Sequence, residues 1–266
     1  MIKNSNDLSN MTILLTGCTG KLGSHYLEVL VSKGAFVIGV DIKESDPRNY
    51  FSNNKVLDLS KIDIFECDIS SPQEINNLYK NINNKYPKID VLINNAAATG
   101  EHLMKYGDAF ASLEDFPLSV WEKVINVNLT APFLLTQRFV NLMNNGGSII
   151  NVSSVYGIKS PDHRMYEDLN FNSMAAYAAS KAGIHGLTKW LSTYLADRGI
   201  RVNTLVPGGV FNNQDPRFVE RYSYKTPMSR MANPEDLVGT VLFLCSDSSS
   251  YCTGQLYVVD GGFSVW

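Results

Sequence analysis

The sequence has no long hydrophobic run and no excess of positive charge, and each absence excludes a class of protein. No segment reaches the roughly 18 consecutive apolar residues of a membrane span. The formal net charge is -3 and the Lys and Arg residues are scattered, which argues against nucleic acid or a membrane as a partner. Residues 1–10 are polar and rich in Asn, without the apolar core of a signal peptide. We therefore predict a cytoplasmic protein.

Cysteine and histidine are scarce, and their spacing fits neither metal binding nor a disulfide framework. The four cysteines, Cys18, Cys67, Cys245 and Cys252, form no CxxC or Cys/His motif. No two of the four histidines have the spacing of metal ligands. The sequence thus predicts reduced thiols and no metal site.

Apolar, β-rich runs alternate with amphipathic stretches along the chain, which is typical of a single α/β domain. The 266 residues are 44% apolar and 18% charged, as in an ordinary globular protein. We predict a polar leader over residues 1–10, one domain over residues 11–266 and a mobile substrate segment near residues 210–230. The predicted strands are residues 11–16, 36–40, 62–68, 87–93, 147–152, 200–206 and 255–259. The pattern predicts a doubly wound parallel sheet of seven strands with helices on both faces and a ligand site at the carboxyl ends of the strands.

A glycine-rich turn follows the first predicted strand. Residues 17–23 read Gly-Cys-Thr-Gly-Lys-Leu-Gly, and a helical pattern continues to about residue 33. Glycines let backbone N–H groups approach a pyrophosphate, and the positive end of the helix dipole faces it. Strand, glycine turn and helix in this order predict a dinucleotide site.

Asp41 stands at the end of the second predicted strand, about 20 residues beyond the glycines. A carboxylate there accepts hydrogen bonds from ribose hydroxyls and repels a 2′-phosphate, which favours NAD over NADP. Two alternatives stay open, because Asp41 could only cap a loop and the nearby Lys43 and Arg48 could receive a phosphate. We predict NAD as the cofactor, with NADP as the alternative.

Tyr177 and Lys181 are four residues apart in a predicted helix over residues 174–195, so their side chains share one face. A cation fixed beside a phenol favours the phenolate and lowers the pKa of the tyrosine from about 10 toward neutrality. The pair can then act as a general acid and base in the interconversion of a carbonyl and its alcohol. Taken alone, such a pair is more often an ordinary feature of a surface helix.

Further motifs follow in order along almost the whole chain. They are Asp68, Asn-Asn-Ala-Ala at residues 94–97, Asn128, Ser154, Pro207-Gly208 and Asp-Gly-Gly at residues 260–262. Together with the glycine turn, Asp41 and the Tyr177–Lys181 pair, they resemble the single-domain short-chain dehydrogenases/reductases. The resemblance implies a Rossmann-type fold and hydride transfer between a substrate carbon and the nicotinamide.

The resemblance also implies the roles of individual residues. Tyr177 exchanges a proton with the substrate oxygen, and Lys181 lowers the pKa of Tyr177 and binds the nicotinamide ribose. Ser154 polarises the carbonyl, and Asn128 holds a water that links Lys181 to solvent. The implied cofactor contacts are Gly17, Thr19, Gly20, Lys21, Leu22, Gly23, Asp41, Asp68, Ile69, Asn94, Ala96, Tyr177, Lys181, Pro207, Gly208 and Val210.

The sequence departs from the pattern of the family at two places. The turn reads TGxxGxxG, with Gly20 one position early and Lys21 where a glycine is common, as in longer members that modify sugar nucleotides. A chain of 266 residues leaves little room for their added domain, so we keep the single-domain prediction. Asn212 stands where a threonine often contacts the nicotinamide amide.

Two connections, residues 99–116 and 159–173, look longer than in the common pattern of the family. They carry the polar residues Glu101, His102, Lys105, Asp108, His163, Arg164, Glu167 and Asp168. Because such loops shape the pocket, we predict a polar substrate, a sugar or sugar phosphate, as in members of surface-polysaccharide and nonulosonic-acid pathways. Arg217, Arg221 and Lys225 share one helical face, either as a clamp for phosphate or carboxylate or as a solvated surface.

The predicted function is therefore hydride transfer between NAD(H) and a secondary alcohol or ketone. The alternatives are an NADP-dependent reductase of an acyl or polyol substrate and a catalytically silent dinucleotide-binding regulatory protein. The intact catalytic set argues against the silent protein, because a sensor needs only the cofactor pocket. The resemblance also suggests a homotetramer or homodimer that buries the apolar residues 255–266, including Tyr257, Phe263 and Trp266.

Overall fold

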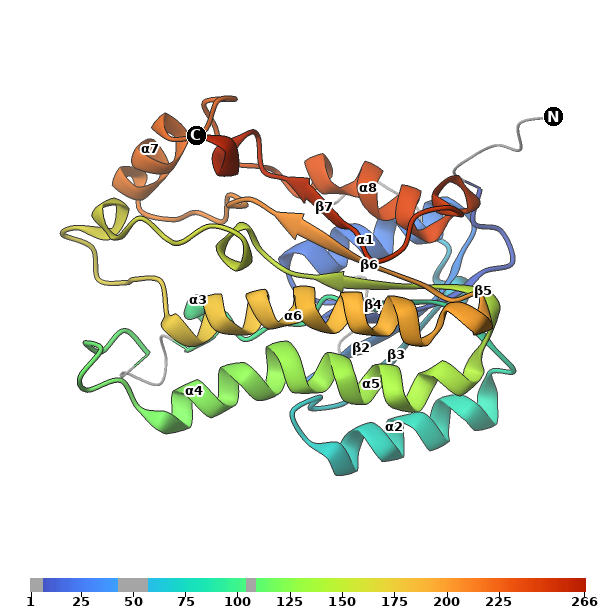
Figure 1. Ribbon diagram of the computed structural model, residues 1–266. Helices are drawn as coiled ribbons and strands as arrows, with labels where there is room; N and C mark the ends of the chain where they lie inside the picture. Colours follow the sequence, from blue (N-terminus) through green and yellow to red (C-terminus); the bar gives the residue numbers. More distant parts are fainter. Residues whose placement is uncertain (1–6, 43–56, 104–108) are drawn as a thin grey trace.

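The computed structural model describes residues 7–42, 57–103 and 109–266 (Figure 1). Lys43 and Arg48, the alternative phosphate ligands, lie outside the described residues, as do Lys105 and Asp108 of the first long connection. None of the described helices is long and apolar enough to cross a membrane.

Seven parallel strands form one sheet in the order β3-β2-β1-β4-β5-β6-β7. The strands are β1 Thr12–Thr16, β2 Phe36–Asp41, β3 Ile62–Glu66, β4 Ile89–Asn94, β5 Met143–Val152, β6 Arg201–Pro207 and β7 Leu256–Val259. The predicted fold is confirmed. The strand order reverses between β1 and β4, and in open α/β sheets ligands bind outside the carboxyl ends of the strands at this point.

Helices cover both faces of the sheet (Figure 1). The helices are α1 Lys21–Ser32, α2 Pro72–Lys85, α3 Gly100–Leu103, α4 Leu118–Ile125, α5 Ala131–Phe139, α6 Ala175–Tyr194, α7 Pro216–Tyr224 and α8 Glu235–Cys245. Figure 1 shows α2, α4, α5 and α6 together on one face, with α1 and α8 on the other. Helix α7 lies at one end of the molecule, beside the last residues of the chain.

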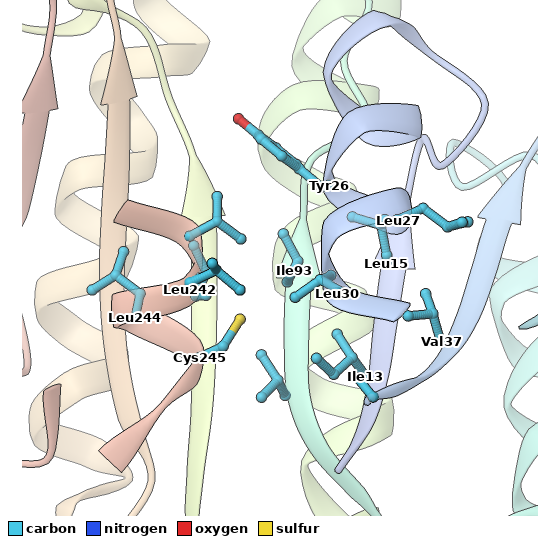
Figure 2. Close-up of a cluster of buried hydrophobic side chains, with 14 of the residues drawn as sticks. Ile13, Leu15, Tyr26, Leu27, Leu30, Val37, Ile93, Leu242, Leu244 and Cys245 are labelled. Carbon is cyan, nitrogen blue, oxygen red and sulfur yellow. The ribbon is translucent and has the colours of Figure 1, made fainter. Parts of the chain in front are cut away.

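Successive strand residues point into two separate cores. Ile13 and Leu15 of β1 pack in the cluster that contains α1 and α8, whereas Leu14 packs in the cluster that contains α2, α5 and α6. Figure 2 shows the first cluster, where Leu27 of α1 and Leu242 of α8 lie over the sheet. Because both faces are covered, the strands read as continuous apolar runs. The sheet is therefore a rigid support, and the polar residues that follow its strands are available to form the site.

The helical region between β4 and β5 that begins at residue 118 is divided into two α-helices. A π-helical turn, Asn126–Thr130, separates α4 from α5, and the amide of Ala131 donates to the carbonyl of Asn126. Pro132 has no N–H with which to bond the carbonyl of Asn128 four residues earlier, so a regular α-helix cannot continue here. Such turns are frequent at functional sites. This one carries Asn128.

The segment of residues 210–230 contains a folded helix. Asp215 caps α7 by accepting a hydrogen bond from the amide of Arg217 at 2.9 Å. Phe218 and Tyr222 of α7 are buried. The predicted mobility of this segment stays a prediction, and its sequence already contained the helix signal Asp-Pro at residues 215–216.

Candidate active site

Ser154, Tyr177 and Lys181 lie together beyond the carboxyl end of β5. Ser154 follows this strand directly, and Tyr177 and Lys181 lie one turn apart on α6. The side chain of Ser154 lies near enough to the phenol of Tyr177 to lower its pKa. The ammonium of Lys181 lies 5.7 Å from the centroid of the Tyr177 ring. The structure thus brings together the three residues that would act on a substrate oxygen.

Burial raises the pKa of Tyr177, and the nearby side chain of Ser154 opposes this effect only in part. This net direction is opposite to the one expected from the sequence, and the lowering of the Tyr177 pKa by Lys181 stays a prediction. Lys181 is only 3% exposed, and burial lowers its own pKa to about 8. Its ammonium donates to the carbonyl of Val152 at 2.8 Å. At neutral pH Tyr177 is consequently protonated and ready to donate.

Ser153, directly after β5, contacts Lys181 and His185 of α6, and sequence reasoning gave neither Ser153 nor His185 a role. The hydroxyl of Ser153 donates to the carbonyl of Lys181 at 2.8 Å and lies 2.8 Å from Nε2 of His185. A Cβ on Gly157 would lie 2.8 Å from the carbonyl oxygen of Lys181. These contacts fix the part of α6 that carries Lys181. The serine pair at residues 153–154 was the sequence signal, and only Ser154 was chosen from it.

Asn128 joins the end of β4 to α6. Its Oδ1 accepts from the amide of Ala98 at 2.7 Å, and its Nδ2 donates to the carbonyl of Ala98 at 3.1 Å and to Oγ of Ser180 at 3.2 Å. Ser180 in turn donates to the carbonyl of Tyr177. Both N–H donors of Asn128 are thereby used. A water held by Asn128 would bond its main-chain carbonyl, to which Pro132 cannot donate. That role stays a prediction.

Two of the three glycines of the turn are required by the chain itself. Gly17 has φ +66°, and a Cβ there would lie 2.8 Å from Cα of Ala96. A Cβ on Gly23 would lie 1.9 Å from the carbonyl oxygen of Gly17. Gly20 differs, because its φ is -72° and a Cβ would meet only the carbonyl oxygen of Gly17, at 3.3 Å. The open space at Gly20 fits a ligand that passes close to the backbone.

Helix α1 begins at this turn and points its amino end toward the same space. Lys21 is its first residue and is exposed, and Leu22 packs against the core. Its first backbone N–H groups have no partner within the helix, and the dipole adds a positive field. The turn and helix therefore fit the pyrophosphate of a dinucleotide.

Asn95 holds the glycine turn against the end of β4. Its Nδ2 donates to the carbonyls of Thr16 and Gly17 at 3.0 and 3.2 Å. The hydroxyl of Thr16 accepts from the amides of Asn95 and Ala96. Sequence reasoning selected Asn94 and Ala96 but not Asn95. The repeated asparagine was the available signal.

Asp41 lies at the end of β2, against the glycine turn. Its Oδ2 accepts from the amide and the hydroxyl of Thr19 at 2.9 and 2.7 Å, and its Oδ1 accepts from the amide of Ile42 at 2.8 Å. The loop-capping alternative is thus part of its role. A carboxylate offers about four acceptor positions, so capacity remains on Oδ1 for ribose hydroxyls.

The other predicted adenosine contacts follow β3 and β4. Asp68 is exposed and accepts from the amide and hydroxyl of Ser70, and Ile69 is buried. Asn94 is buried, and its Nδ2 donates to Oδ1 of Asn151 at 2.8 Å. Oδ1 of Asn94 has no hydrogen-bond partner among the described residues. A buried acceptor without a donor fits a site completed by a hydroxyl group or a water.

The predicted nicotinamide segment follows β6. Pro207 ends this strand, and a Cβ on Gly208 would lie 2.8 Å from Cα of Asp260. Val210 forms a parallel bridge with Ala232. The close approach of residue 208 to Asp260 explains why residue 208 is a glycine. The predicted cofactor residues therefore lie on the turn and along the carboxyl ends of the strands, and they fit a dinucleotide. No group of three His, Cys, Asp or Glu residues that could hold a metal occurs in the described ranges.

The long connection of residues 159–173 turns its charged side chains outward. His163, Arg164, Glu167 and Asp168 are exposed, whereas Met165 and Tyr166 between them are buried. These two join an aromatic cluster composed of Val155, Tyr156, Met165, Tyr166, Leu169, Phe171, Phe218, Val219, Tyr222, Met231 and Phe263. These four of the polar side chains from which a polar substrate was inferred therefore do not line an interior. In this region the polar groups that face inward are the hydroxyl groups of the tyrosines in the aromatic cluster.

The cationic face of α7 is bonded within the chain. Arg217 pairs with Asp215, and Lys225 forms an ion pair with Asp162. Arg221 donates to two carbonyls of the long connection, those of residues 165 and 167, at 3.3 and 2.6 Å. These groups tie α7 to the connection, and the phosphate clamp has no support from their geometry.

A cavity of about 690 Å³ lies between the connection, the end of α7 and the last residues of the sequence. Lys159, Asp162, Lys225, Phe263 and Trp266 are among its lining residues. None of the predicted catalytic residues lines it. The cavity is therefore distinct from the space beside Ser154 and Tyr177.

Comparison with known proteins agrees with this geometry. Residues 21–264 match a protein-family model described as Enoyl-(Acyl carrier protein) reductase. The 3-oxoacyl-[acyl-carrier-protein] reductase FabG of Thermotoga maritima is 33% identical, with 97% of this chain and 99% of that protein covered. The post-translational flagellin modification protein A of Campylobacter coli is 32% identical, with 97% and 100% covered.

Comparison with a solved structure agrees with these sequence relatives. The short chain dehydrogenase of Leptospira borgpetersenii serovar Hardjo-bovis, with bound NAD+, superimposes with a TM-score of 0.85 at 37% identity, covering 99% of this chain and 97% of that one. The match extends over nearly the full length of both chains, so it includes the glycine turn and the Ser154–Tyr177 site. The chain belongs to the short-chain dehydrogenase/reductase family of oxidoreductases.

Proposed function

We propose that the protein is an NAD(H)-dependent oxidoreductase that interconverts a secondary alcohol and a ketone of a polar, sugar-like substrate. The observation that carries the proposal is the placement of Ser154, Tyr177 and the buried Lys181 together at the strand ends next to the glycine turn, with Ser154 near enough to Tyr177 to act on its pKa. We also propose that it works in the cytoplasm as a homotetramer or homodimer.

Each residue of this set has a separate task in carbonyl reduction. Ser154 hydrogen-bonds the carbonyl oxygen and orients it. Tyr177, protonated at neutral pH because burial raises its pKa, donates a proton to that oxygen. Lys181 and Asn128 hold α6 and the end of β4 in place around it. The nicotinamide, when bound, supplies the hydride.

Two observations support NAD over NADP. Asp41 keeps acceptor capacity beside the turn, and its negative charge repels a 2′-phosphate. The Leptospira relative contains NAD+. A role outside the reduction of acyl chains is supported by the relative named a post-translational flagellin modification protein.

A second candidate is reduction of an acyl substrate with NADPH. The relative from Thermotoga maritima, named a 3-oxoacyl-[acyl-carrier-protein] reductase, favours it. Turnover of polyols with NAD, compared with turnover of a 3-oxoacyl thioester with NADPH, separates the two candidates. Loss of turnover in Tyr177→Phe, with dinucleotide binding retained, would exclude a silent regulatory protein.

The experiment that tests the cofactor choice is a fluorescence titration of wild type and Asp41→Ala with NADH and NADPH. We expect wild type to bind NADH at least about tenfold more tightly, because a buried or half-buried charge contact is worth over 1.4 kcal/mol. Asp41→Ala should lose this preference. Asp197→Ala, at an exposed aspartate before β6, is the matched control. Equal binding of the two dinucleotides by wild type would overturn the NAD assignment.

A further inference from the structure

Tyr156 and Tyr166 place a pair of phenol groups beside the catalytic serine and tyrosine. Tyr156 lies two residues beyond Ser154, and its amide donates to Oγ of Ser154 at 3.2 Å. Its hydroxyl lies 2.7 Å from the hydroxyl of Tyr166, which comes from the connection of residues 159–173. Burial, and then the neighbouring phenols including Tyr177, raise the pKa of Tyr156. The three phenols are therefore close enough to influence one another.

The hydroxyl pair has one hydrogen-bond donor left over. Two phenols carry two protons, and the bond between Tyr156 and Tyr166 uses one of them. Oγ of Ser173 has no hydrogen-bond partner among the described residues, so it does not accept the remaining proton. The surroundings are otherwise aromatic, with Phe171 and Phe218 5.8 and 5.2 Å from the Tyr166 ring. A buried donor in such surroundings is costly unless a partner accepts from it.

The pair is held in place from two sides. Arg221 of α7 donates to the carbonyls of residues 165 and 167, on either side of Tyr166. Phe218 of α7 contacts the rings of both Tyr166 and Phe171. The position of Tyr156 is fixed by its own bond to Ser154. The donor is therefore preorganised relative to the reacting group.

We propose that the Tyr156–Tyr166 hydroxyl pair recognises an oxygen substituent on the carbon next to the reacting carbon, so that α-hydroxy ketones and their diols are preferred substrates. The proposal rests on the proposed function, since Ser154 and Tyr177 must hold the carbonyl oxygen. Because Tyr156 lies two residues beyond Ser154 and its phenol is near enough to that of Tyr177 to be influenced by it, the pair reaches a group attached close to that carbonyl. A site built to hydrogen-bond a substrate hydroxyl rejects the analogue that lacks it.

The test compares two probes that differ by one hydroxyl, acetoin and butanone, in NADH oxidation by wild type, Tyr156→Phe and Tyr166→Phe. We expect wild type to prefer acetoin at least tenfold in kcat/KM. Each variant should lower kcat/KM for acetoin about tenfold, mainly through KM, and leave butanone within about threefold. Tyr251→Phe, the same change at a fully exposed tyrosine, is the matched control.

The outcomes separate this inference from the proposed function. A wild type that binds NADH but shows no preference for acetoin, or turns over neither ketone, would overturn the recognition of an α-hydroxyl. Variants that keep the wild-type preference would overturn the role of the tyrosine pair. Failure of the proposed function would instead appear as absence of NADH binding by the wild type in the same samples.

Discussion

At the scale of single residues, the sequence predicted which side chains meet but not their ionisation. The i, i+4 spacing of Tyr177 and Lys181 is a helical property, and it placed both on one face of α6. Their pKa values depend on burial, which is set by strands and helices distant in sequence. Burial raises the pKa of Tyr177 and lowers that of Lys181 to about 8. Positions were therefore predictable, and charge states were not.

Replacement of Lys181 by Met should stabilise the protein at neutral pH and abolish turnover. A lysine whose pKa falls from 10.5 to about 8 on folding costs about 3 kcal/mol below pH 8, at 1.36 kcal/mol for each tenfold change. Loss of the bond to the carbonyl of Val152 offsets about 1 kcal/mol of this. We expect a net gain of about 1–2 kcal/mol in the free energy of unfolding at pH 7, measured by urea denaturation.

The pH dependence of this difference is the sharper check. Between pH 8 and pH 10.5 the unfolded wild type binds a proton at Lys181 that the folded wild type has lost, so wild-type stability rises with pH in this window. The variant lacks this rise, and its advantage should shrink toward pH 10.5. Lys189→Met, on the same helix, should show no such trend. A difference that is constant from pH 7 to pH 10 would contradict a lowered pKa of Lys181.

At the scale of helices, strands and connections, local sequence signals indicated where elements begin. The sequence did not indicate the tertiary contacts that these elements make. Ser71 followed by Pro72 is a typical signal for the start of a helix, and α2 begins there, with Oγ of Ser71 accepting from the amide of Glu74. The connection of residues 159–173 was read as polar, because sequence cannot tell which of its side chains face inward. Its charged residues face solvent, and the backbone carbonyls that Arg221 binds have no sequence signature.

Arg221→Ala should loosen the substrate side of the site without weakening cofactor binding. The variant loses two bonds between α7 and the connection, which together contribute about 1–2 kcal/mol for a partly exposed guanidinium. We expect faster hydrogen exchange in residues 159–173 and in α7, a several-fold higher KM and an unchanged affinity for NADH. Arg217→Ala is the matched control, because the hydrogen bonds of the Arg217 guanidinium go to Asp215, two residues away in the sequence. Equal effects of the two variants would show that the link to the connection does not matter.

At the scale of the whole molecule, the sheet was predictable because alternating strands and helices allow few arrangements. The surfaces through which subunits would associate were predicted less well. Phe263, expected between subunits, is buried within the chain and stacks on Tyr222 with ring centroids 4.5 Å apart. Trp266 stays exposed. A second apolar surface is formed on α6 by Trp190 and Tyr194, which stack on each other and which the sequence reading did not single out.

Two separate apolar surfaces are what a tetramer with twofold axes requires. Trp190 and Trp266 are 54% and 72% exposed, and each would be buried twice in an isologous interface. A buried Trp contributes about 2–3 kcal/mol, so a charge in its place should weaken each interface by at least about a hundredfold. We therefore expect Trp190→Glu and Trp266→Glu each to form dimers and the double variant to be monomeric, as measured by light scattering at micromolar concentration. Leu113→Glu, at an exposed residue of another connection, should leave the assembly unchanged. A wild type that is monomeric at this concentration would exclude the proposed oligomer, whereas a dimeric wild type dissociated by only one of the two variants would assign that surface as the single interface.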